Sequence, residues 1–465
     1  IFHFFTIWCS KTPSMRKFFT LFLSIATILL WGQSVTLKPI STNVDPLTQL
    51  HLNRFDVLLL DPATLQQAID DIPGNVKRIT LRTPRQSWQL ELFEYSLLSP
   101  NAVRNSTDPR QPTHLPARKD FRTFKGHLAG QINSRVSMSL ADGFLKLMVD
   151  DRGERYFVEP VNKASLSEQF PASHQYFLYR QSDVVPVKGV SCGADVLNER
   201  LQEGQRHMEE KNKELNYRSA RCPKCVEVQI ALAADITMFN KYGSVAGAEN
   251  QMLSILADVQ TVFDNECEHQ YEYQVTGTYV AADVQRDPWA GIRDIFEQLE
   301  VFSQVGITIF SGTSYEVATN WTDKFRTRVI GVAYLSQVCN LQPYNVCSDY
   351  IAAGGRQGNY LTLQAHELGH NWSMFHDAEI SPTIMAPVIN GSAYWSATSV
   401  FSLNNYVNIN SLIESGCLSI CPGSDAPTVD FSADVTYGCQ PLTVRFKDLS
   451  TFVDKWEWSF PGGTP

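Results

Sequence analysis

Three of the ten histidines fall within one short run, His366-Glu367-Leu368-Gly369-His370-Asn371-Trp372-Ser373-Met374-Phe375-His376-Asp377. Residues four apart lie on the same face of a helix, so His366 and His370 can bind one metal ion. Glu367 follows the first of them and can act as general base on a water molecule. His376 becomes a third ligand if the chain turns back after the helix. Three neutral imidazoles leave one position open, which is typical of a catalytic zinc site.

The competing interpretation of this run is a solvent-exposed helix on which histidines fall by chance. A His-Glu-x-x-His pattern alone occurs by chance in many long chains, but the third spaced histidine makes it more specific. The sequence therefore predicts one catalytic Zn²⁺ held by His366, His370 and His376, with Glu367 as the catalytic base.

The elements that must position this run follow from its surroundings. Leu361 to Phe375 has the character of a helix and carries the site. Alternating helices and strands over about 200 residues indicate an α/β or α+β domain. The boundaries predicted for it are 222–421, with strands at 226–234, 307–310 and 329–335 and helices at 246–263 and 292–302.

The N-terminal region has the layout of a secretory signal at residues 15–34. Met15 and two basic residues precede an apolar run of about 14 residues, which is shorter than the ~20 that a membrane helix needs. No later segment is long and apolar enough to span a membrane. Residues 1–14 are interpreted as preceding the true start, so Cys9 is left out of the cysteine arithmetic.

Residues 35–221 form a separate β-rich region without a catalytic constellation. Period-two alternation predicts strands at 88–93 and 136–140, the second followed by a turn at 141–143. A charged stretch at 196–221 indicates a linker or solvated helix, and Arg218-Ser219-Ala220-Arg221 is either a processing site or part of an ordinary charged helix.

Nine cysteines remain once Cys9 is set aside, so at least one is free or pairs with a partner outside this sequence. Cys222-x-x-Cys225 with Cys417 and Cys421 could form a second, four-thiolate zinc site. In an exported protein disulfides are the stronger interpretation. The net charge of −9 and the pI of about 5.6 disfavour nucleic acid as a partner.

At this point the sequence resembles the metzincins, and within them the adamalysin/reprolysin branch. Asp377 directly after the third histidine marks that branch, and Ile384-Met385-Ala386-Pro387 is similar to its Met-turn. Gly331-Val332-Ala333-Tyr334 is similar to its edge strand. The resemblance implies a five-stranded mixed sheet with an active-site helix, an apolar floor formed by Met385, and a zinc endopeptidase acting on proteins or peptides.

The resemblance extends into residues 35–221, where 124–130 and 156–160 are similar to the reprolysin propeptide. Val190-Ser191-Cys192-Gly193 resembles its cysteine switch, which implies that Cys192 caps the zinc and that the propeptide inhibits its own enzyme. The alternative for Cys192 is a disulfide. The resemblance breaks at Ser373, where the family has a glycine that lets the chain turn sharply; serine at positive φ costs roughly 1 kcal/mol.

Residues 427–465 resemble a PKD domain that is cut short, an all-β sandwich common in exported bacterial proteins. The sequence therefore predicts a secreted, bacterial protein. Glu227 is a calcium ligand by family analogy alone. The rival interpretations are a zinc-binding adhesion module that has lost turnover, a permanently latent protein, and a zinc amidase or deacetylase. Glu367 argues against the first, Arg218 to Arg221 against the second, and the Met-turn against the third.

Overall fold

The computed structural model describes residues 33–41, 51–116, 118–161, 174–185, 190–200, 225–266, 270–324, 328–349, 356–421, 431–433 and 442–448. Of the predicted signal at 15–34, only Gln33 and Ser34 are among them. The predicted processing site at 218–221 and the cysteines at 222, 267 and 439 lie outside the described residues. In the described part of the chain, no helix combines the length and apolar character needed to cross a bilayer.

The described residues before Asp183 are mostly strands, and most of these belong to a ten-stranded sheet. Its neighbours run antiparallel except for the parallel first pair. The order is β1 (Gln33–Thr36), β4 (Val76–Arg82), β5 (Ser87–Tyr95), β8 (Arg122–Leu128), β9 (Gln131–Ala141), β10 (Phe144–Asp151), β11 (Glu154–Pro160), β12 (Gln175–Arg180), β3 (Asp56–Leu59) and β2 (Lys38–Pro39).

The ten-stranded sheet curls until its two edges meet. Its edge strands β1 and β2 are consecutive and are separated by Leu37 alone. Alternate residues such as Leu90 and Leu92 face a core that is closed by Leu65 and Ile69 of α3 (Pro62–Asp70). The sequence predicted strands at 88–93 and 136–140, and β5 and β9 confirm both.

The second sheet has nine strands, which is more than the five predicted from the sequence. It follows the order β13 (Ser191–Cys192), β17 (Val329–Ala333), β18 (Tyr344–Ser348), β16 (Val317–Thr322), β14 (Cys225–Ala234), β15 (Gln270–Val280), β6 (Leu98–Ser106) and β7 (His114–Leu115), with β19 (Ser419–Ile420) paired to β14. Of the four extra strands, β6, β7 and β13 come from the N-terminal part of the chain and extend both edges, and the short β19 pairs with β14. The sheet is mixed, because β17 runs antiparallel to β18 while β14, β15, β16 and β18 are parallel.

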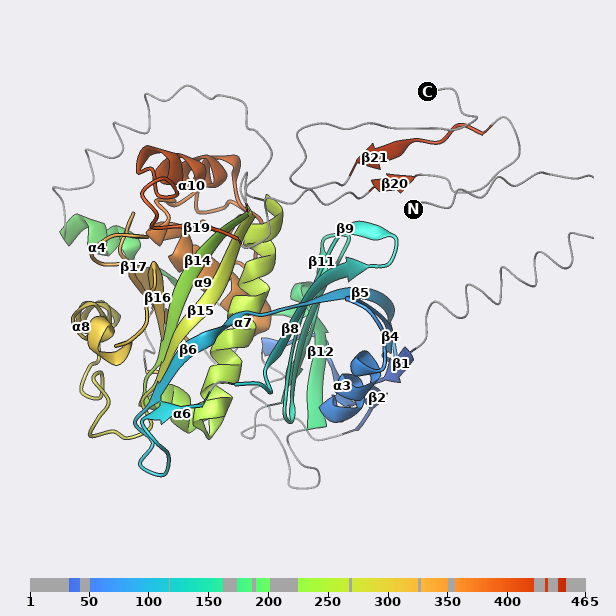
Figure 1. Cartoon of the computed structure of the whole chain (residues 1–465), viewed down its shortest axis with the longest axis horizontal. Coiled ribbons are helices and arrows are strands. Elements are labelled where there is room, and N and C mark those ends of the chain that lie inside the picture. The colour runs from blue at the N-terminus through green and yellow to red at the C-terminus, as the bar shows by residue number, and fades with distance from the viewer. Residues whose placement is uncertain are drawn as a thin grey trace, which may run out of the picture.

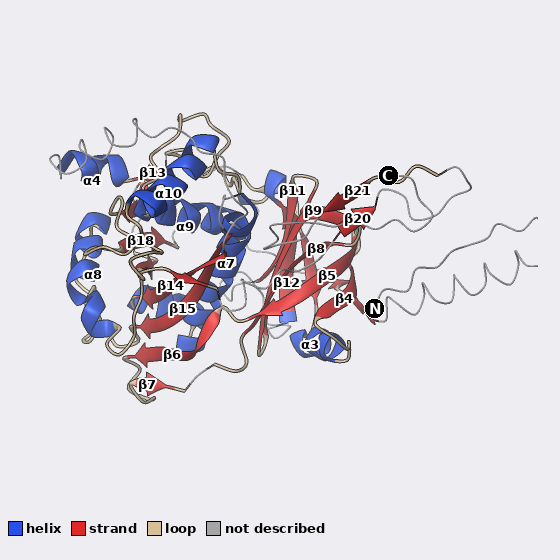
Figure 2. Ribbon diagram, turned by 45° about the horizontal axis from the view of Figure 1, so that its top comes forward, coloured by secondary structure: helices blue, strands red, loops and turns tan. Residues whose placement is uncertain are grey.

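Helices cover both faces of the nine-stranded sheet (Figures 1 and 2). On β14, Ile230 and Leu232 pack toward α7 (Val245–Glu266) and α9 (Gln357–Asn371). The alternate residues Ala231 and Ala233 pack in the cluster that includes α8 (Ile295–Ile309). Smaller elements are α4 (Ala194–Arg200), α6 (Ile236–Tyr242), α10 (Ala397–Ile409), the 3₁₀ helix η3 (Gln181–Asp183), and the isolated pair β20 (Phe431–Ala433) and β21 (Phe446–Asp448).

Most predicted elements of this region are confirmed, and one is wrong. β14, α7, β17 and α9 lie where strands and helices were predicted, although α9 begins at Gln357 and ends at Asn371. Residues 307–310 were predicted as a strand, but 307–309 are the end of α8 and Phe310 is its C-cap. The helical spacing of the buried residues Leu299, Phe302 and Gly306 continues into this run, and Ile307 is exposed. Helical packing therefore overrides the β-propensity of a short β-branched run.

Two disulfides, Cys225–Cys421 and Cys339–Cys417, join residues that are distant in the sequence. They exclude the four-thiolate zinc site that was considered for Cys222, Cys225, Cys417 and Cys421, because three of those sulfurs are already bonded. Cys192 and Cys347 are the free cysteines among the described residues, and both are buried. The alternative of a disulfide at Cys192 is therefore wrong.

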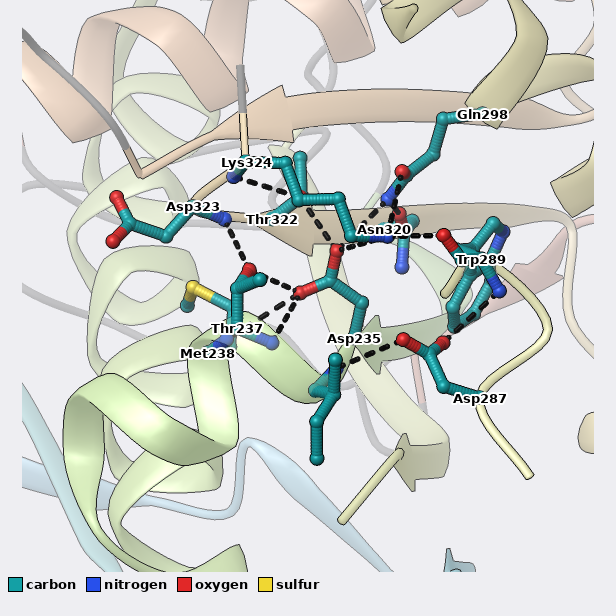
Figure 3. A network of polar contacts seen from close by, with 11 residues as sticks. Asp235, Thr237, Met238, Asp287, Trp289, Gln298, Asn320, Thr322, Asp323 and Lys324 are labelled. Atoms are coloured by element: carbon teal, nitrogen blue, oxygen red, sulfur yellow. Dashed lines mark hydrogen bonds and ion pairs between the residues drawn. The ribbon is translucent and has the colours of Figure 1, made fainter. Parts of the chain in front are cut away.

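A buried polar network around Asp235 connects α6, α8 and β16 (Figure 3). Asp235 is fully buried and caps α6, where its Oδ1 accepts from the backbone of Thr237 at 3.0 Å. Its Oδ2 accepts from the Thr322 hydroxyl at 2.6 Å and lies 3.1 Å from Lys324 Nζ. Gln298 donates to the same oxygen at 3.4 Å. The carboxylate is thus surrounded by donors from several elements, as a buried charge requires.

Candidate metal centre

Helix α9 places His366, Glu367 and His370 in its last turns, where all three are buried. The Nε2 atoms of His366 and His370 lie 3.0 Å apart, as expected for residues four apart on one helical face. The chain after the helix brings back His376, whose Nε2 lies 3.2 Å from each of the other two. The three predicted ligands therefore meet at one point.

The turn that returns His376 depends on Ser373, whose φ is +72°. The backbone nitrogen of Ser373 donates to the His370 carbonyl at 2.9 Å, and that of Met374 donates to the Gly369 carbonyl at 2.8 Å. These bonds end α9 with a left-handed residue, which is the conformation that favours glycine. The sequence-based expectation of positive φ at this serine is confirmed.

Each imidazole of the cluster is oriented by a partner at Nδ1. His366 Nδ1 contacts the Ile384 carbonyl at 2.7 Å, and His370 Nδ1 contacts the Met374 carbonyl at 2.9 Å. Because a carbonyl only accepts, Nδ1 carries the hydrogen and Nε2 keeps its lone pair. Burial, followed by the neighbouring histidines, lowers the pKa of His366 to about 3 and that of His370 well below its usual value. These two rings are therefore neutral near pH 7.

Lone pairs that face one another at such short distances repel unless a cation lies between them. A tetrahedral metal with nitrogens at about 2.0–2.1 Å would separate them by roughly 3.3 Å, close to the 3.0 and 3.2 Å observed here. The Cys192 sulfur lies 3.4 Å from His370 Nε2. The potential ligand atoms of Cys192, His366, His370 and His376 all lie within 4.8 Å of one another, so this donor set fits a zinc ion.

Residues 377–396 pack against α9 and are connected by hydrogen bonds to the turn that carries His376. A Cβ on Gly369 would lie 2.6 Å from the Met385 sulfur, so the buried Met385 side chain packs directly against the α9 backbone. Asp377 donates from its backbone to the Met385 carbonyl at 2.9 Å. Its carboxylate accepts from the hydroxyls of Thr383 at 2.6 Å and Ser396 at 2.8 Å. Met385 thus packs against the helix that carries His366 and His370, and its role as an apolar floor stays a prediction.

Glu367 is fully buried on α9 between His366 and His370, against β17. A Cβ on Gly331 would clash with Glu367 Oε1 in its present position, so the glycine leaves room for the carboxylate there. Burial raises the pKa of Glu367 to about 8, against a lowering effect from Cys192. Oε2 accepts from the Cys192 thiol at 3.5 Å, while Oε1 has no hydrogen-bond partner among the described residues. The carboxylate therefore keeps unused hydrogen-bonding capacity at the oxygen that lies against Gly331.

Residues 191–193 fill the cleft, which is the space between β17 and the segment after Met385. Ser191 and Gly193 donate from their backbone nitrogens to the carbonyls of Arg328 at 2.7 Å and Gly331 at 2.9 Å. The backbone nitrogen of Cys192 donates in the opposite direction, to Pro387 at 3.0 Å. Burial and the Glu367 charge raise the pKa of the Cys192 thiol well above its usual value, so a thiolate here needs a cation beside it.

Sequence reasoning missed Asp195, which lies on α4 three residues after Cys192. Its Oδ2 contacts His376 Nδ1 at 2.9 Å and so gives the third histidine the same kind of outer partner as the other two. The sequence signal that could have drawn attention to Asp195 is a carboxylate three residues after Cys192, but this spacing does not reveal the contact with His376. Glu227, considered for calcium, is half-buried on β14, and burial followed by Glu272 raises its pKa. Calcium binding stays an untested prediction.

Comparison with known protein families agrees with this geometry. The family model described as "Metallo-peptidase family M12B Reprolysin-like" matches residues 223–414. That part of the chain, which contains α9 and the whole histidine cluster, is therefore a reprolysin-like M12B metallopeptidase domain.

Proposed function

We propose that the protein is a secreted, zinc-dependent endopeptidase made as a latent precursor. The observation that carries the proposal is the convergence of three Nε2 atoms at 3.0–3.2 Å beside the buried carboxylate of Glu367. His366, His370 and His376 would hold the zinc. Bound there, the metal would polarise the scissile carbonyl and make water more acidic.

Glu367 would accept a proton from the attacking water and return it to the leaving amine. Its position against Gly331 keeps the carboxylate beside β17, which would become an edge strand once residues 191–193 leave and along which a substrate carbonyl would lie. Met385 and Asp377 would keep the ligands in place, since one packs under α9 and the other connects the metal-binding loop to the Met-turn.

The path of residues 191–193 supports a protein or peptide substrate. An extended chain fits between β17 and Pro387 and finds backbone acceptors on both sides. Binding of this kind adds a strand to a sheet edge and uses main-chain hydrogen bonds that any peptide can supply. The arrangement supports cleavage of extended polypeptide segments.

Latency is proposed from the same segment, because Cys192 occupies the cleft and its sulfur approaches His370. The proposed division is a signal at 15–34, an inhibitory prosegment at 35–221, a catalytic domain at 222–421 and a PKD domain at 427–465. Two disulfides are compatible with an oxidising, extracellular compartment.

The experiment compares the wild-type protein with Glu367→Ala after cleavage at Arg221 and removal of the N-terminal fragment. Denatured casein is the substrate, and zinc content is measured by mass spectrometry. We expect turnover to fall by a factor of about 10² to 10⁴ with one zinc still bound per chain, because the base is lost but the ligands stay. Exposed Glu379 serves as a matched control, and Glu379→Ala should cleave casein like the wild type.

Two results would contradict the proposal. If Glu367→Ala keeps full activity, Glu367 is not the base. If the wild type binds zinc but cleaves neither casein nor gelatin, and a chelator changes nothing, the alternative of a zinc-binding adhesion module replaces the endopeptidase.

A further inference from the structure

A long contact between the two sheets lies outside the metal centre. β6 follows β5 of the ten-stranded sheet but joins β15 of the other sheet in parallel register, with Arg104 beside Thr278 and Ser106 beside Val280. Figure 1 shows this strand, in blue, crossing from one sheet to the other. β7 pairs with β6 in turn. The N-terminal part of the chain therefore supplies the last strands on this side of the nine-stranded sheet.

Side chains of β6 contact helices on both faces of that sheet. Arg104 donates to the two carboxylate oxygens of Glu249 on α7, at 3.0 and 2.5 Å. The next residue, Asn105, donates to the carbonyl of Ile309 at the end of α8, at 2.9 Å. Arg104 and Asn105 are only 7% and 6% exposed. The end of β6 that carries Arg104 and Asn105 is thus buried as deeply as an interior strand of the sheet.

The charge of Glu249 is neutralised by the N-terminal part of the chain. Glu249 is 0% exposed, and its cationic partners are Arg104 and Arg118, the latter at 3.6 Å. The catalytic domain itself contributes the Thr278 hydroxyl, which donates at 2.8 Å. A buried carboxylate that loses its counter-ions is strongly destabilised. Departure of β6 would therefore leave Glu249 with an uncompensated charge.

Lys125 forms further ion pairs in which the cation again comes from the N-terminal part of the chain and the carboxylates come from the other sheet and its helix. Lys125 of β8 lies 3.0 Å from Asp264 on α7 and 2.9 Å from Glu272 on β15. The cations come from the ten-stranded sheet and the carboxylates from α7 and β15. Charge complementarity therefore accompanies the strand pairing along this surface.

We propose that the β15 edge, together with Glu249, is a docking surface for residues 98–118 of this chain. It holds the prosegment on the catalytic domain independently of Cys192, and it keeps holding it after the chain between the two parts has been cut. The proposal rests on the proposed function only in treating residues 35–221 as a prosegment. Release of the catalytic domain then requires β6 to detach from β15, so cutting the linker alone does not expose the cleft.

The test measures how long the prosegment stays bound. The full zinc-loaded chain carries a C-terminal tag and the Glu367→Ala substitution, which prevents self-digestion. It is cut at Arg218 and Arg221 with a trace of trypsin and washed on a tag-binding resin, and the retained N-terminal half is quantified over time. We expect the protein without further changes and Cys192→Ala to lose it at rates within threefold of each other.

Arg104→Met removes the buried guanidinium and should speed loss of the prosegment at least tenfold. Arg78 offers a matched control, because its side chain is 42% exposed and pairs within the ten-stranded sheet with Glu91, which is 21% exposed; Arg78→Met should change nothing. The double variant Arg104→Met/Glu249→Met removes both buried charges, and retention should recover to within threefold of the parent protein.

The proposal is overturned if Arg104→Met retains the prosegment as long as the parent protein, or if Cys192→Ala alone releases it as fast as Arg104→Met is expected to. If Arg104→Met yields no folded, zinc-binding protein, Arg104→Lys replaces it, because lysine keeps the charge but loses the two-nitrogen contact with Glu249. Loss of the prosegment from Arg104→Lys at least three times faster than from the parent protein supports the proposal. Unchanged retention of the prosegment overturns it. Retention of the prosegment is measured without any peptide cleavage by this protein. The docking proposal can therefore be tested even if the endopeptidase proposal fails.

Discussion

The metallopeptidase domain at residues 223–414 buries two clusters of polar side chains, one around Asp235 and one around His370. Both central residues are almost inaccessible to solvent, at 0% and 2% exposure. Asp235 is surrounded by donors, including the Thr237 backbone, the Thr322 hydroxyl and Lys324. At the other cluster, three lone pairs face one another and Glu367 Oε1 has no hydrogen-bond partner among the described residues.

This difference separates a structural cluster from a functional one. Depth of burial does not distinguish them. The Asp235 cluster uses its bonding capacity within the protein, so its contribution is to the free energy of folding. In the histidine cluster, the Nε2 lone pairs of the three imidazoles are directed toward one point and are not used by the protein. This arrangement is stable only when a ligand such as a metal ion occupies that point. The comparison predicts that substitutions in the two clusters have separable effects on stability and on zinc binding.

The largest expected effect is the loss of zinc from His370→Ala. Removing one of three protein ligands should abolish stoichiometric zinc binding and reduce casein cleavage to background. Zinc addition should raise the unfolding midpoint of the wild type, since a ligand that binds only the native state stabilises it, and should leave that of His370→Ala unchanged. A zinc-dependent shift in the variant would show that the metal lies elsewhere.

The reverse pattern is expected for Asp235→Ala. It leaves Lys324, whose side chain is 11% exposed, without its carboxylate partner, and it removes the N-cap of α6. Breaking a buried pair in this way costs about 3–5 kcal/mol. Urea unfolding should show this loss while the zinc content of the folded fraction stays at one per chain. If zinc is lost in proportion, the two clusters are not separate.

The smallest effect is expected at the left-handed serine of the metal-binding turn. Ser373→Gly should relieve strain of up to about 1 kcal/mol without changing which ligands bind zinc. Ser411 has φ of +47°, is exposed and lies outside the cluster. Ser411→Gly should give a similar gain in stability, but only Ser373→Gly should slow zinc release to a chelator. Equal release rates in the two variants would mean that the turn does not limit zinc binding.

The sequence predicted those parts of the site that are local. Three histidines and a glutamate within one helix and its following turn follow from helical spacing, and the structure places them as expected. The pairing of β6 with β15 could not be predicted, because Leu98-Ser-Pro-Asn-Ala-Val-Arg-Asn-Ser shows no clear alternation and its partner lies far along the chain. The contact of Asp195 with His376 is equally non-local. Such contacts depend on tertiary packing, which short-range patterns do not record.

The disulfide between Cys225 and Cys421 has a mechanical consequence. It joins the first residue of β14 to a residue 196 positions later. This second residue, Cys421, directly follows β19, which pairs with β14. A pulling force applied to the chain on either side of this pair passes through one covalent bond and does not load the strands, α9 or the histidine cluster. Force applied between the chain just before Cys225 and the chain just after Cys421 is therefore carried by the disulfide, and the residues between the two cysteines, including the histidine cluster, are not stretched.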